Sequence, residues 1–496
     1  MNKIQKLSLS RDVSLGMDRF TGLSRTEIHH ILSFLPVQEV VRTCVLSKRW
    51  INIWSSVPSF HFNQKLFQTT KKFTKFVDSV LFFRDGSDFQ KFHLSLVTEF
   101  QARDIARVDS WITYAVRHNV QSLHIENDCT KNVLLTPQLF SCESLTELRL
   151  SRNKLFVPPC VYLPALKTLH LISVVLKDGQ LDEVLFSASP SLETFILEDC
   201  DFMPGILTIS ASKLRYLNLK GSFPSSIVIS APNLISLKLS ISNLLPVNIM
   251  VSENLKSLSD ANIDLGFHSS QSTTQLISIF KSARYLTLST LSAQSISEEL
   301  HKYLSILTCD KTLFSNLKWL KIETLFSDHE IVLINSIIRH SPEIESVFLV
   351  NDMPIYVELG NDPSSFSCIQ TPFSNLKWLK IGTLFSDNDI MLIKNLLKDS
   401  LQIEYVILLV EEAWSLCKLS HLKLVEMQGF RGSQIEVKLV KFFLENAIVL
   451  ERMIITVSKS DQWISIDKQG MMRIGRELLK HPRASSSVGI LFLHDL

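Results

Sequence analysis

The residue types that could support catalysis or bind a metal do not fall at the spacings that such chemistry needs. His329 and Glu330 begin like a zinc-binding H-E-x-x-H helix, but Leu333 occupies the position of the second histidine. His29 and His30 are adjacent, so a helix would point them to different faces. The eight cysteines form no C-x-x-C pair, which favours reduced thiols in the core of an intracellular protein. We therefore expect no metal site, no cofactor and no catalytic residue; a hydrolase with a non-standard site is the least favoured alternative.

Glycine is scarce, with 14 among 496 residues, and this excludes several nucleotide-binding and hydrolase motifs. The closest pair is Gly429 and Gly432, so neither G-x-G-x-x-G, nor a P-loop, nor a G-x-S-x-G elbow is present. The net charge of +2 is too balanced for a nucleic-acid-binding footprint. Residues 1–16 lack the apolar run of a signal peptide, and no apolar stretch is long enough to span a membrane. We expect no nucleic-acid or membrane partner and a location in the cytoplasm or nucleus.

The elements that could position functional residues begin with a small helical module at residues 17–62, which we call the front module. Apolar residues from Ile28 to Leu35 follow the i, i+3, i+4, i+7 spacing of an amphipathic helix that ends at Pro36. A second helix precedes Ser47, which is placed to cap a third helix reaching Trp54. Three short helices bury little surface, so we expect this module to need either the following domain or a partner to complete its core. Exposed apolar groups on so small a module would form a docking surface; the alternative is a plain N-terminal cap for the array.

The front module resembles a plant F-box. The motifs that carry the resemblance are Asp18-Arg19, Leu23, Ile31–Pro36 and Val41–Trp50. The resemblance implies binding to a Skp-type adaptor and, through it, to a cullin ubiquitin ligase complex. The adaptor-binding residues that it implies are Leu23, Ser24, Ile28, Leu32, Leu35, Pro36, Val45, Leu46 and Trp50.

One position departs from the family pattern. The family usually has Leu-Pro followed by acidic residues where this chain has Leu23-Ser24-Arg25-Thr26. The alternative interpretation is therefore an interaction scaffold with weakened or lost ligase coupling.

The pattern L-x-x-L-x-L recurs through the following residues and predicts a leucine-rich-repeat solenoid at 120–411. Its copies begin at Val120, Leu145, Leu166, Leu192, Leu214, Leu234, Leu255, Ala283, Leu317, Ile344, Leu376 and Ile403. The copy at Leu255 is degenerate, because Asp260 takes its last apolar position. Each copy predicts a short strand whose leucines face inward and stack on the next unit. Asn153 and Cys200 fall at the position that bonds neighbouring turns, and the scarcity of glycine indicates few left-handed turns.

A tandem duplication enlarges the predicted array. Residues 314–328 match residues 373–387 at 14 of 15 positions, at an offset of 373 − 314 = 59 residues. A weaker echo extends the two copies to 314–352 and 373–411. Such insertions are tolerated in solenoids because each unit contacts mainly its neighbours.

Residues 412–496 have another texture and, from about 416 to 457, resemble the FBD domain of plant F-box/leucine-rich-repeat proteins. We expect an α+β cap there. The predicted fold class is α/β, with a disordered extension at 1–16, the three-helix front module at 17–62, a connector and the start of the array at 63–119, the repeats at 120–411 and the cap.

The residues that alternate with the buried leucines should line the concave face of the array. The candidates for binding a target protein are Arg149, His170, Tyr216, Asn218, Lys238, Tyr285, Trp319, Lys321, Trp378 and Lys380. Trp319 and Trp378 lie at equivalent places in the duplicated units, either as a paired contact for a target or as packing against neighbouring strands. The resemblance implies a non-catalytic substrate-recognition subunit of an SCF-type ubiquitin ligase whose target the sequence does not name.

Overall fold

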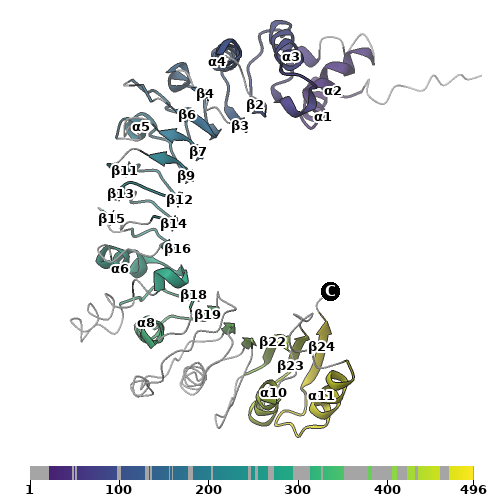
Figure 1. The fold of residues 1–496 in the computed structure, drawn as a ribbon, viewed down its shortest axis with the longest axis vertical. Helices are drawn as coiled ribbons and strands as arrows, with labels where there is room; N and C mark the ends of the chain where they lie inside the picture. The colour runs from purple at the N-terminus through teal and green to yellow at the C-terminus, as the bar shows by residue number, and fades with distance from the viewer. Residues whose placement is uncertain are drawn as a thin grey trace, which may run out of the picture. The chain divides into compact units, whose positions relative to one another are not determined.

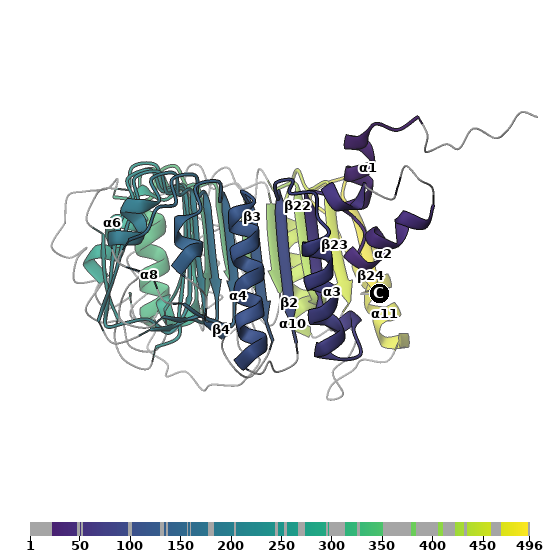
Figure 2. The ribbon, with the colours of Figure 1, turned by 90° about the horizontal axis from the view of Figure 1, so that it is seen from above.

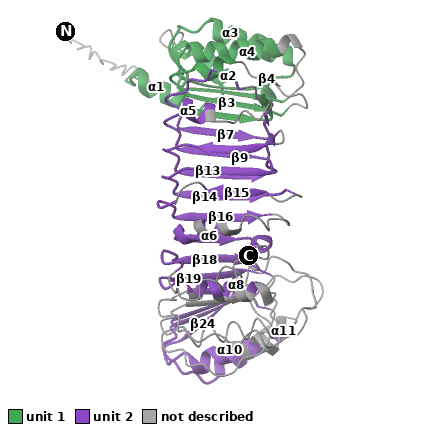
Figure 3. Ribbon diagram, turned by 90° about the vertical axis from the view of Figure 1, so that its left-hand side faces the viewer, with its two compact units in different colours: residues 1–154 green, residues 155–496 purple. Residues whose placement is uncertain are grey.

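The fold is known from a computed structural model, in which the chain forms two compact units, residues 1–154 and 155–496 (Figure 3). The structure describes residues 22–46, 50, 53–97, 102–128, 133–134, 137–155, 157–158, 160–176, 183–202, 205–243, 247–251, 255–265, 273–293, 296, 313–324, 328–350, 378–382, 405–409, 422–430, 434–457 and 468–494.

Short helices form the front module. Helix α1 (Arg25–Leu32) is followed by α2 (Val37–Arg42) and the 3-10 turn η1 (Thr43–Val45) (Figure 1). Pro36 lies at the N-cap of α2 rather than at the end of α1, which stops four residues earlier. Ser47, the predicted cap of a third helix, lies outside the described residues, and the predicted end of that helix is the 3-10 turn η3 (Trp54–Ser56).

Parallel strands, one for each repeat, follow in both units. In unit 1 they are β1 (Ser59–Asn63), β2 (Lys91–Leu96), β3 (Ser122–Asn127) and β5 (Glu147–Ser151). In unit 2 they begin with β7 (Thr168–Ile172), β9 (Thr194–Glu198), β12 (Tyr216–Gly221), β14 (Ser236–Ile241), β16 (Asp260–Leu265) and β17 (Tyr285–Leu288). The predicted leucine-rich-repeat architecture is confirmed.

The register of these strands explains the leucine pattern. Leu217 on β12 lies beside Leu237 on β14, and Leu219 lies beside Leu239. All four side chains are buried. Each buried leucine contributes about 1.5–3 kcal/mol, so the inward residues of neighbouring strands supply the main stabilisation of the array.

The register also corrects the prediction at the degenerate repeat. Asp260 pairs with Ser236, which is an outward position, and Ala261 pairs with the inward Leu237. The unit therefore begins at Leu258 rather than Leu255, and Ala261 takes the middle leucine position. A small residue at an inward position concealed the pattern.

The sheet of unit 1 begins before the predicted start at Val120. Strand β1 lies partly inside the predicted range of the front module, and β2 lies in the predicted connector. Their inward residues include Phe60 and Phe62 on β1 and Phe92 on β2, all buried. The spacing is the same as in later repeats, but phenylalanine replaces leucine, so a pattern built on leucine missed these strands.

The elements that follow the repeat strands differ between the two units: helices in unit 1 and, in part of unit 2, short strands. In unit 1, α3 (Thr70–Phe82) and α4 (Ala102–Arg117) cover one face of β2 and β3 (Figure 2). In unit 2, the strands β11 (Ile206–Ser210), β13 (Ser226–Ser230) and β15 (Asn248–Val251) form a second parallel sheet. Short strands therefore take the place of some of the predicted irregular helices.

The ladder residues occupy the predicted position at the ends of strands. The Asn153 side-chain amide donates to the carbonyl oxygens of Ile125 (3.1 Å) and Ser151 (2.8 Å). The Cys200 thiol donates to the Leu171 carbonyl oxygen at 3.4 Å. Burial raises the pKa of Cys200 to about 11, so the thiol keeps the proton that it donates. The predicted ladder role is confirmed.

Few of the described residues have a left-handed backbone, as the low glycine content predicted, but four of the six that do are not glycine. Arg152, Ser173 and Asp199 have φ angles of 55°, 49° and 51° at the ends of successive strands. These residues accept a conformation that costs an L-residue about 1–2 kcal/mol. The buried strands on either side hold them there, so glycine is not required at these turns.

Each copy of the duplication contributes two strands to the sheet. The first copy contains β18 (Trp319–Glu323), α8 (Asp328–Arg339) and β19 (Ser346–Val350), and the second contains β20 (Trp378–Gly382) and β21 (Tyr405–Leu409). These four strands are parallel neighbours in chain order. Most of the second copy's remaining residues, including 383–404, lie outside the described residues.

The C-terminal region continues the parallel sheet formed by the repeat strands, which we call the main sheet. Its elements are β22 (Leu424–Phe430), α10 (Gln434–Asn446), β23 (Arg452–Val457), α11 (Lys468–Lys480) and β24 (Gly489–His494). Strand β22 pairs in parallel with β21, and β23 and β24 extend the same sheet. The expected α+β cap therefore continues the strand–helix repeat, and the sheet extends as far as β24.

Gly221 is the position where the array tolerates no side chain. Its φ angle is 118°, and a Cβ atom there would lie 2.9 Å from the Asp199 Cα atom. We expect Gly221→Ala to destabilise unit 2 by about 1–3 kcal/mol, measured as a lower urea midpoint. Gly205→Ala is the matched control, because nothing lies within 4 Å of its Cβ position. Equal midpoints for the two variants would contradict the backbone constraint.

Candidate binding surfaces

The front module exposes several large apolar side chains, which together we call the front-module patch. Between 40% and 83% of each side chain is accessible to solvent. The patch consists of Ile31, Phe34, Leu35, Val45 and Leu46. Exposed apolar groups concentrated on so small a module indicate a protein-binding surface.

The structure separates the predicted adaptor-binding residues into two groups. Leu35, Val45 and Leu46 belong to the patch, and Ser24 and Pro36 are exposed beside half-buried Leu23. The side chains of Ile28, Leu32 and Trp50 are buried, which corrects their prediction as contact residues.

The buried group supports the patch from beneath. Exposed Ile31 and Phe34 were missed among the candidates, although Ile31 lies between buried Ile28 and Leu32 on α1. Exposure could not be assigned from apolar type alone, since both groups are equally apolar.

Ser24 has a defined structural role at the start of α1. Its hydroxyl accepts a hydrogen bond from the Glu27 backbone N–H at 3.2 Å, and its own N–H donates to the Glu27 carboxylate at 2.7 Å. This reciprocal pair is a capping box. The serine that departs from the family pattern therefore stabilises the helix that carries part of the patch.

Arg84 ties the front module to the first strand of unit 1. Its guanidinium donates to the carbonyl oxygens of Val57 (2.7 Å) and Ser87 (2.8 Å). It also lies 4.0 Å from the ring centre of Phe89 and 5.0 Å from that of Phe60. A buried guanidinium with these partners fixes the end of the front module against the sheet.

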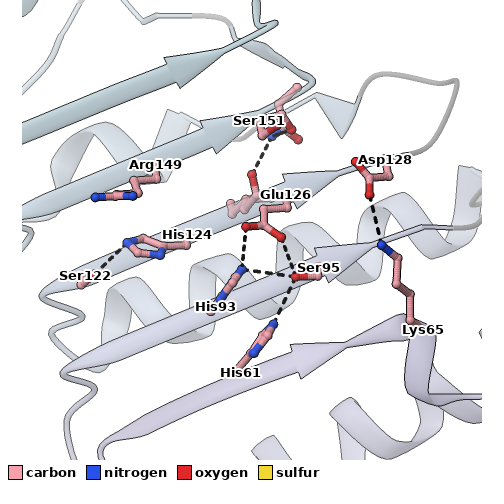
Figure 4. Close-up of polar contacts among 12 residues, drawn as sticks. His61, Lys65, His93, Ser95, Ser122, His124, Glu126, Asp128, Arg149 and Ser151 are labelled. Carbon is pink, nitrogen blue, oxygen red and sulfur yellow. Dashed lines mark hydrogen bonds and ion pairs between the residues drawn. The ribbon is translucent and has the colours of Figure 1, made fainter. Parts of the chain in front are cut away.

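Polar side chains cover the face of the main sheet opposite the helices, which we call the open face (Figure 4). In unit 1 its central row consists of His61, His93, His124 and Arg149, which the strand register aligns side by side. We call the three histidines the histidine ladder. Of this row, only Arg149 was predicted. His61 and His93 were missed because their strands have phenylalanine at inward positions, whereas His124 lies in the copy that begins at Val120, at the position of Arg149 in the next copy, so the repeat pattern could have identified it.

The ladder is held by ring contacts and a shared serine. The rings of His61 and His93 stack with 3.9 Å between their centres, and His93 and His124 make an edge contact at 5.5 Å. The Ser95 hydroxyl lies 3.2 Å from a ring nitrogen of each of His61 and His93, and it donates to the Glu126 carboxylate at 2.9 Å. Glu126 also lies 3.3 Å from the His93 ring nitrogen.

A second carboxylate closes the network on β5. Glu147 accepts hydrogen bonds from the Ser122 hydroxyl at 2.8 Å and from the Arg149 guanidinium at 2.7 Å. It also lies 3.3 Å from the His124 ring nitrogen. Both carboxylates of the network are thus supplied with donors from this chain.

Burial sets the protonation of the ladder. Burial lowers the pKa of all three histidines, against the attraction of Glu126 for His61 and His93 and of Glu147 for His124. Burial opposes ionisation of Glu126 and Glu147 as well, but hydrogen bonds from Ser95 and Ser122 bring their pKa values below the usual range. At neutral pH the ladder is therefore uncharged beside two ionised carboxylates.

Comparison with known proteins identifies the parts of the chain. The F-box domain family matches residues 20–62, the leucine-rich repeats of the FBD-associated F-box protein At5g56370 match 108–309, and the FBD family matches 416–455. An F-box, leucine-rich repeats and an FBD domain thus follow one another along the chain, in the order that the sequence resemblance predicted. The front module is its F-box, and the C-terminal region contains its FBD domain.

The curated relatives come from Arabidopsis thaliana. The putative FBD-associated F-box protein At5g53635 is 28% identical over 94% of this chain and 98% of its own length. FBD-associated F-box protein At4g10400 is 29% identical over 75% of this chain and 88% of its own length. F-box/LRR-repeat protein 13 is 34% identical over 39% of this chain and 44% of its own length. The chain covers most of the length of the first two relatives, and the names of both combine an F-box with FBD.

Several predicted target-binding residues of unit 2 are held by neighbours on the open face. His170 lies 3.7 Å from the Glu198 carboxylate, to which the Asn218 amide donates at 3.4 Å. Lys321 pairs with Glu323 at 2.7 Å. Exposed positions among the unit 2 candidates are Lys238, Tyr216 and Tyr285.

The two tryptophans of the duplicated units occupy equivalent register positions. Trp319 pairs with Ser346, which pairs with Trp378 on the next strand. The Trp319 ring contacts Phe348 with 5.0 Å between centres, which favours the packing interpretation for this residue. The side chains of Trp378 and Lys380 lie outside the described residues.

The described residues contain neither a cluster of metal-binding side chains nor a membrane-spanning helix. No group of three or more histidine, cysteine, aspartate or glutamate residues is arranged there to hold a metal ion. Among the helices that the structure describes, none is both long and apolar enough to cross a membrane.

The capping box makes the role of Ser24 testable. We expect Ser24→Ala to weaken α1 by about 0.5–2 kcal/mol. The substitution removes the hydroxyl that accepts from the Glu27 N–H, and the reciprocal bond from the Ser24 N–H loses the geometry that this hydroxyl supports. Amide hydrogen exchange within Arg25–Leu32 would measure the effect. The control is Ser33→Ala at the other end of α1, where the hydroxyl donates only to the His30 carbonyl. Unchanged exchange in Ser24→Ala would contradict the assignment.

The histidine ladder predicts a loss of stability in mild acid. Because folding lowers the histidine pKa values, the unfolded chain takes up protons first as the pH falls below about 6.5. The contribution of the neutral ladder to the free energy of unfolding is therefore fully present above that pH and is lost as the pH falls below it. We expect the triple variant His61→Gln, His93→Gln, His124→Gln to lose less stability between pH 7.5 and 5.5 than the wild type, measured by urea unfolding. His30→Gln, an exposed histidine outside the ladder, should keep the wild-type dependence.

Proposed function

We propose that this F-box protein is the substrate-recognition subunit of an SCF-type cullin ubiquitin ligase. The observation that supports the proposal is the front-module patch, in which five apolar side chains are exposed on a module of the F-box family. Exposing these groups to water is unfavourable unless a partner covers them. The partner in this proposal is a Skp-type adaptor, which links the chain to the cullin complex.

In this proposal the front-module patch binds the adaptor and the open face binds the target. Residues 17–62 bind the adaptor, and residues 120–411 bind an unknown target protein through the open face. Residues 63–119 connect the two, and residues 412–496 extend the sheet beyond the repeats. The predicted target contacts on unit 2 remain part of this proposal, together with Arg149 on unit 1.

The mechanism in this proposal is positioning rather than catalysis by this chain. Holding a target and the ubiquitin carrier in one complex raises the effective concentration of the target's lysines near the activated ubiquitin. The chain is then a non-catalytic subunit that needs no cofactor, and it acts in the cytoplasm or nucleus. Its parallel strands provide a rigid base for the target-binding side chains.

Removal of the patch should abolish adaptor binding. We expect the double variant Val45→Asp, Leu46→Asp to weaken binding to a purified Skp-type adaptor at least about 100-fold, because each charge would be desolvated in an apolar contact. Biolayer interferometry on the full chain would measure the affinity. Leu66→Asp is the matched control, since Leu66 is 57% exposed in the same unit but lies outside the patch.

The same measurement distinguishes the alternative of an interaction scaffold without ligase coupling. Failure of the folded wild-type chain to bind the adaptor would overturn the proposal and favour the scaffold. The variant Ser24→Pro restores the family's residue at a compatible φ of −67° but removes both capping hydrogen bonds. If it binds far more tightly than the wild type, Ser24 has weakened the coupling.

A further inference from the structure

A pocket of about 260 Å³ lies where the F-box meets the first strands of unit 1. Ser33 and Leu35 contribute to it from the F-box, and Ser59, His61, Lys91 and His93 contribute from β1 and β2. A volume of this size accepts a side chain or a small molecule rather than a folded domain. Strand β1 brings the two parts together, so neither part forms this pocket by itself.

The pocket combines hydrogen-bond donors with a wall of imidazoles. Ser59 and Lys91 are register partners at the start of β1 and β2, two residues before the stacked pair His61 and His93. Within the described part of the chain, neither the Ser59 hydroxyl nor the Lys91 ammonium has a hydrogen bond or ion pair. A lysine is a compact positive charge with three donors, which suits an oxyanion.

The nearby carboxylates do not compete for these donors. Glu126 is engaged by Ser95 and His93, and Glu147 by Ser122, Arg149 and His124. Lys65, the other lysine that follows β1, pairs with Asp128 at 3.6 Å. Lys91 is thus the cation that the network leaves available in the pocket.

We propose that this pocket binds an oxyanion group, a carboxylate or a phosphoryl group, through the Lys91 ammonium and the Ser59 hydroxyl, with the His61 and His93 rings beside it. Leu35 supplies an apolar contact for the carbon atoms that carry the group. The site goes beyond the proposed adaptor role and does not require it, although Leu35 belongs to both surfaces.

Binding in this pocket should be linked to proton uptake. Without a ligand, a proton on His61 is opposed by burial and by His93, and favoured by Glu126. A proton on His93 is opposed by burial and by His124 and favoured by Glu126, while His124 faces Glu147 and Arg149. An oxyanion beside the stacked pair adds a negative charge and makes one proton on it more favourable. Affinity should therefore rise as the pH falls from 7.5 to 6.0.

The test is an NMR titration of the full chain, with ¹³C-labelled histidine, by inorganic phosphate and by acetate at constant ionic strength. We expect saturable shifts of the ladder resonances, and acetate binding about threefold tighter at pH 6.0 than at pH 7.5, because histidine titrates in this range while acetate keeps its charge. A tighter constant for phosphate indicates a phosphoryl ligand, and a tighter constant for acetate indicates a carboxylate. Chloride at the same ionic strength should produce no saturable shift.

Matched variants separate the site from general electrostatics. Lys91→Gln should weaken binding at least about tenfold through loss of a charge-assisted contact, whereas Lys65→Gln should leave it unchanged. His61→Gln should reduce the pH dependence of binding, because it removes one of the two imidazoles beside the oxyanion. The proposal is overturned if neither anion gives saturable shifts, if Lys65→Gln is as damaging as Lys91→Gln, or if affinity does not vary with pH. Adaptor affinity measured on the same samples keeps this result distinct from failure of the ligase proposal.

Discussion

The alignment of inward side chains between neighbouring parallel strands is the constraint on which the rest of this structure depends. A single strand with two apolar residues cannot remove them from water, but a neighbour in register buries both pairs. The constraint accepts phenylalanine at Phe60 and Phe92, leucine at Leu217 and Leu237, and alanine at Ala261. It also holds Arg152, Ser173 and Asp199 in left-handed turns that would be unfavourable in isolation.

The same register determines the chemistry of the open face. Side chains that alternate with the buried ones are carried at the strand spacing of about 4.8 Å, so residues from distant parts of the sequence form continuous rows. In unit 1 one row brings together three histidines, and the adjoining rows place Glu126 and Glu147 beside them. Burial keeps the histidines neutral, while donated hydrogen bonds keep the carboxylates ionised. Rigid strands thus maintain an uncharged ladder, two satisfied carboxylates and one available lysine in a small area.

The F-box differs from the repeats because it is too small to bury all of its apolar residues. Ile28, Leu32 and Trp50 form its interior, and Arg84 links its end to β1. The remaining apolar side chains stay on the surface, where the proposed adaptor would cover them. The capping box shows that Ser24, which departs from the family motif, stabilises the start of α1.

The three-part organisation, the repeat, the duplication and the ladder roles of Asn153 and Cys200 could be predicted from the amino-acid sequence, because each depends on local spacing. The sequence did not reveal the strands that use phenylalanine, the shifted unit at Leu258, or the parallel continuation of the sheet through the FBD domain. Those features depend on which residues face a neighbour, and one-dimensional spacing does not contain that information. For the same reason, only the tertiary structure distinguished buried Leu32 from exposed Leu35 and Val45. Only the register of β1, β2 and β3 assembled His61, His93 and His124 into one ladder, since the three residues lie on strands separated by helices.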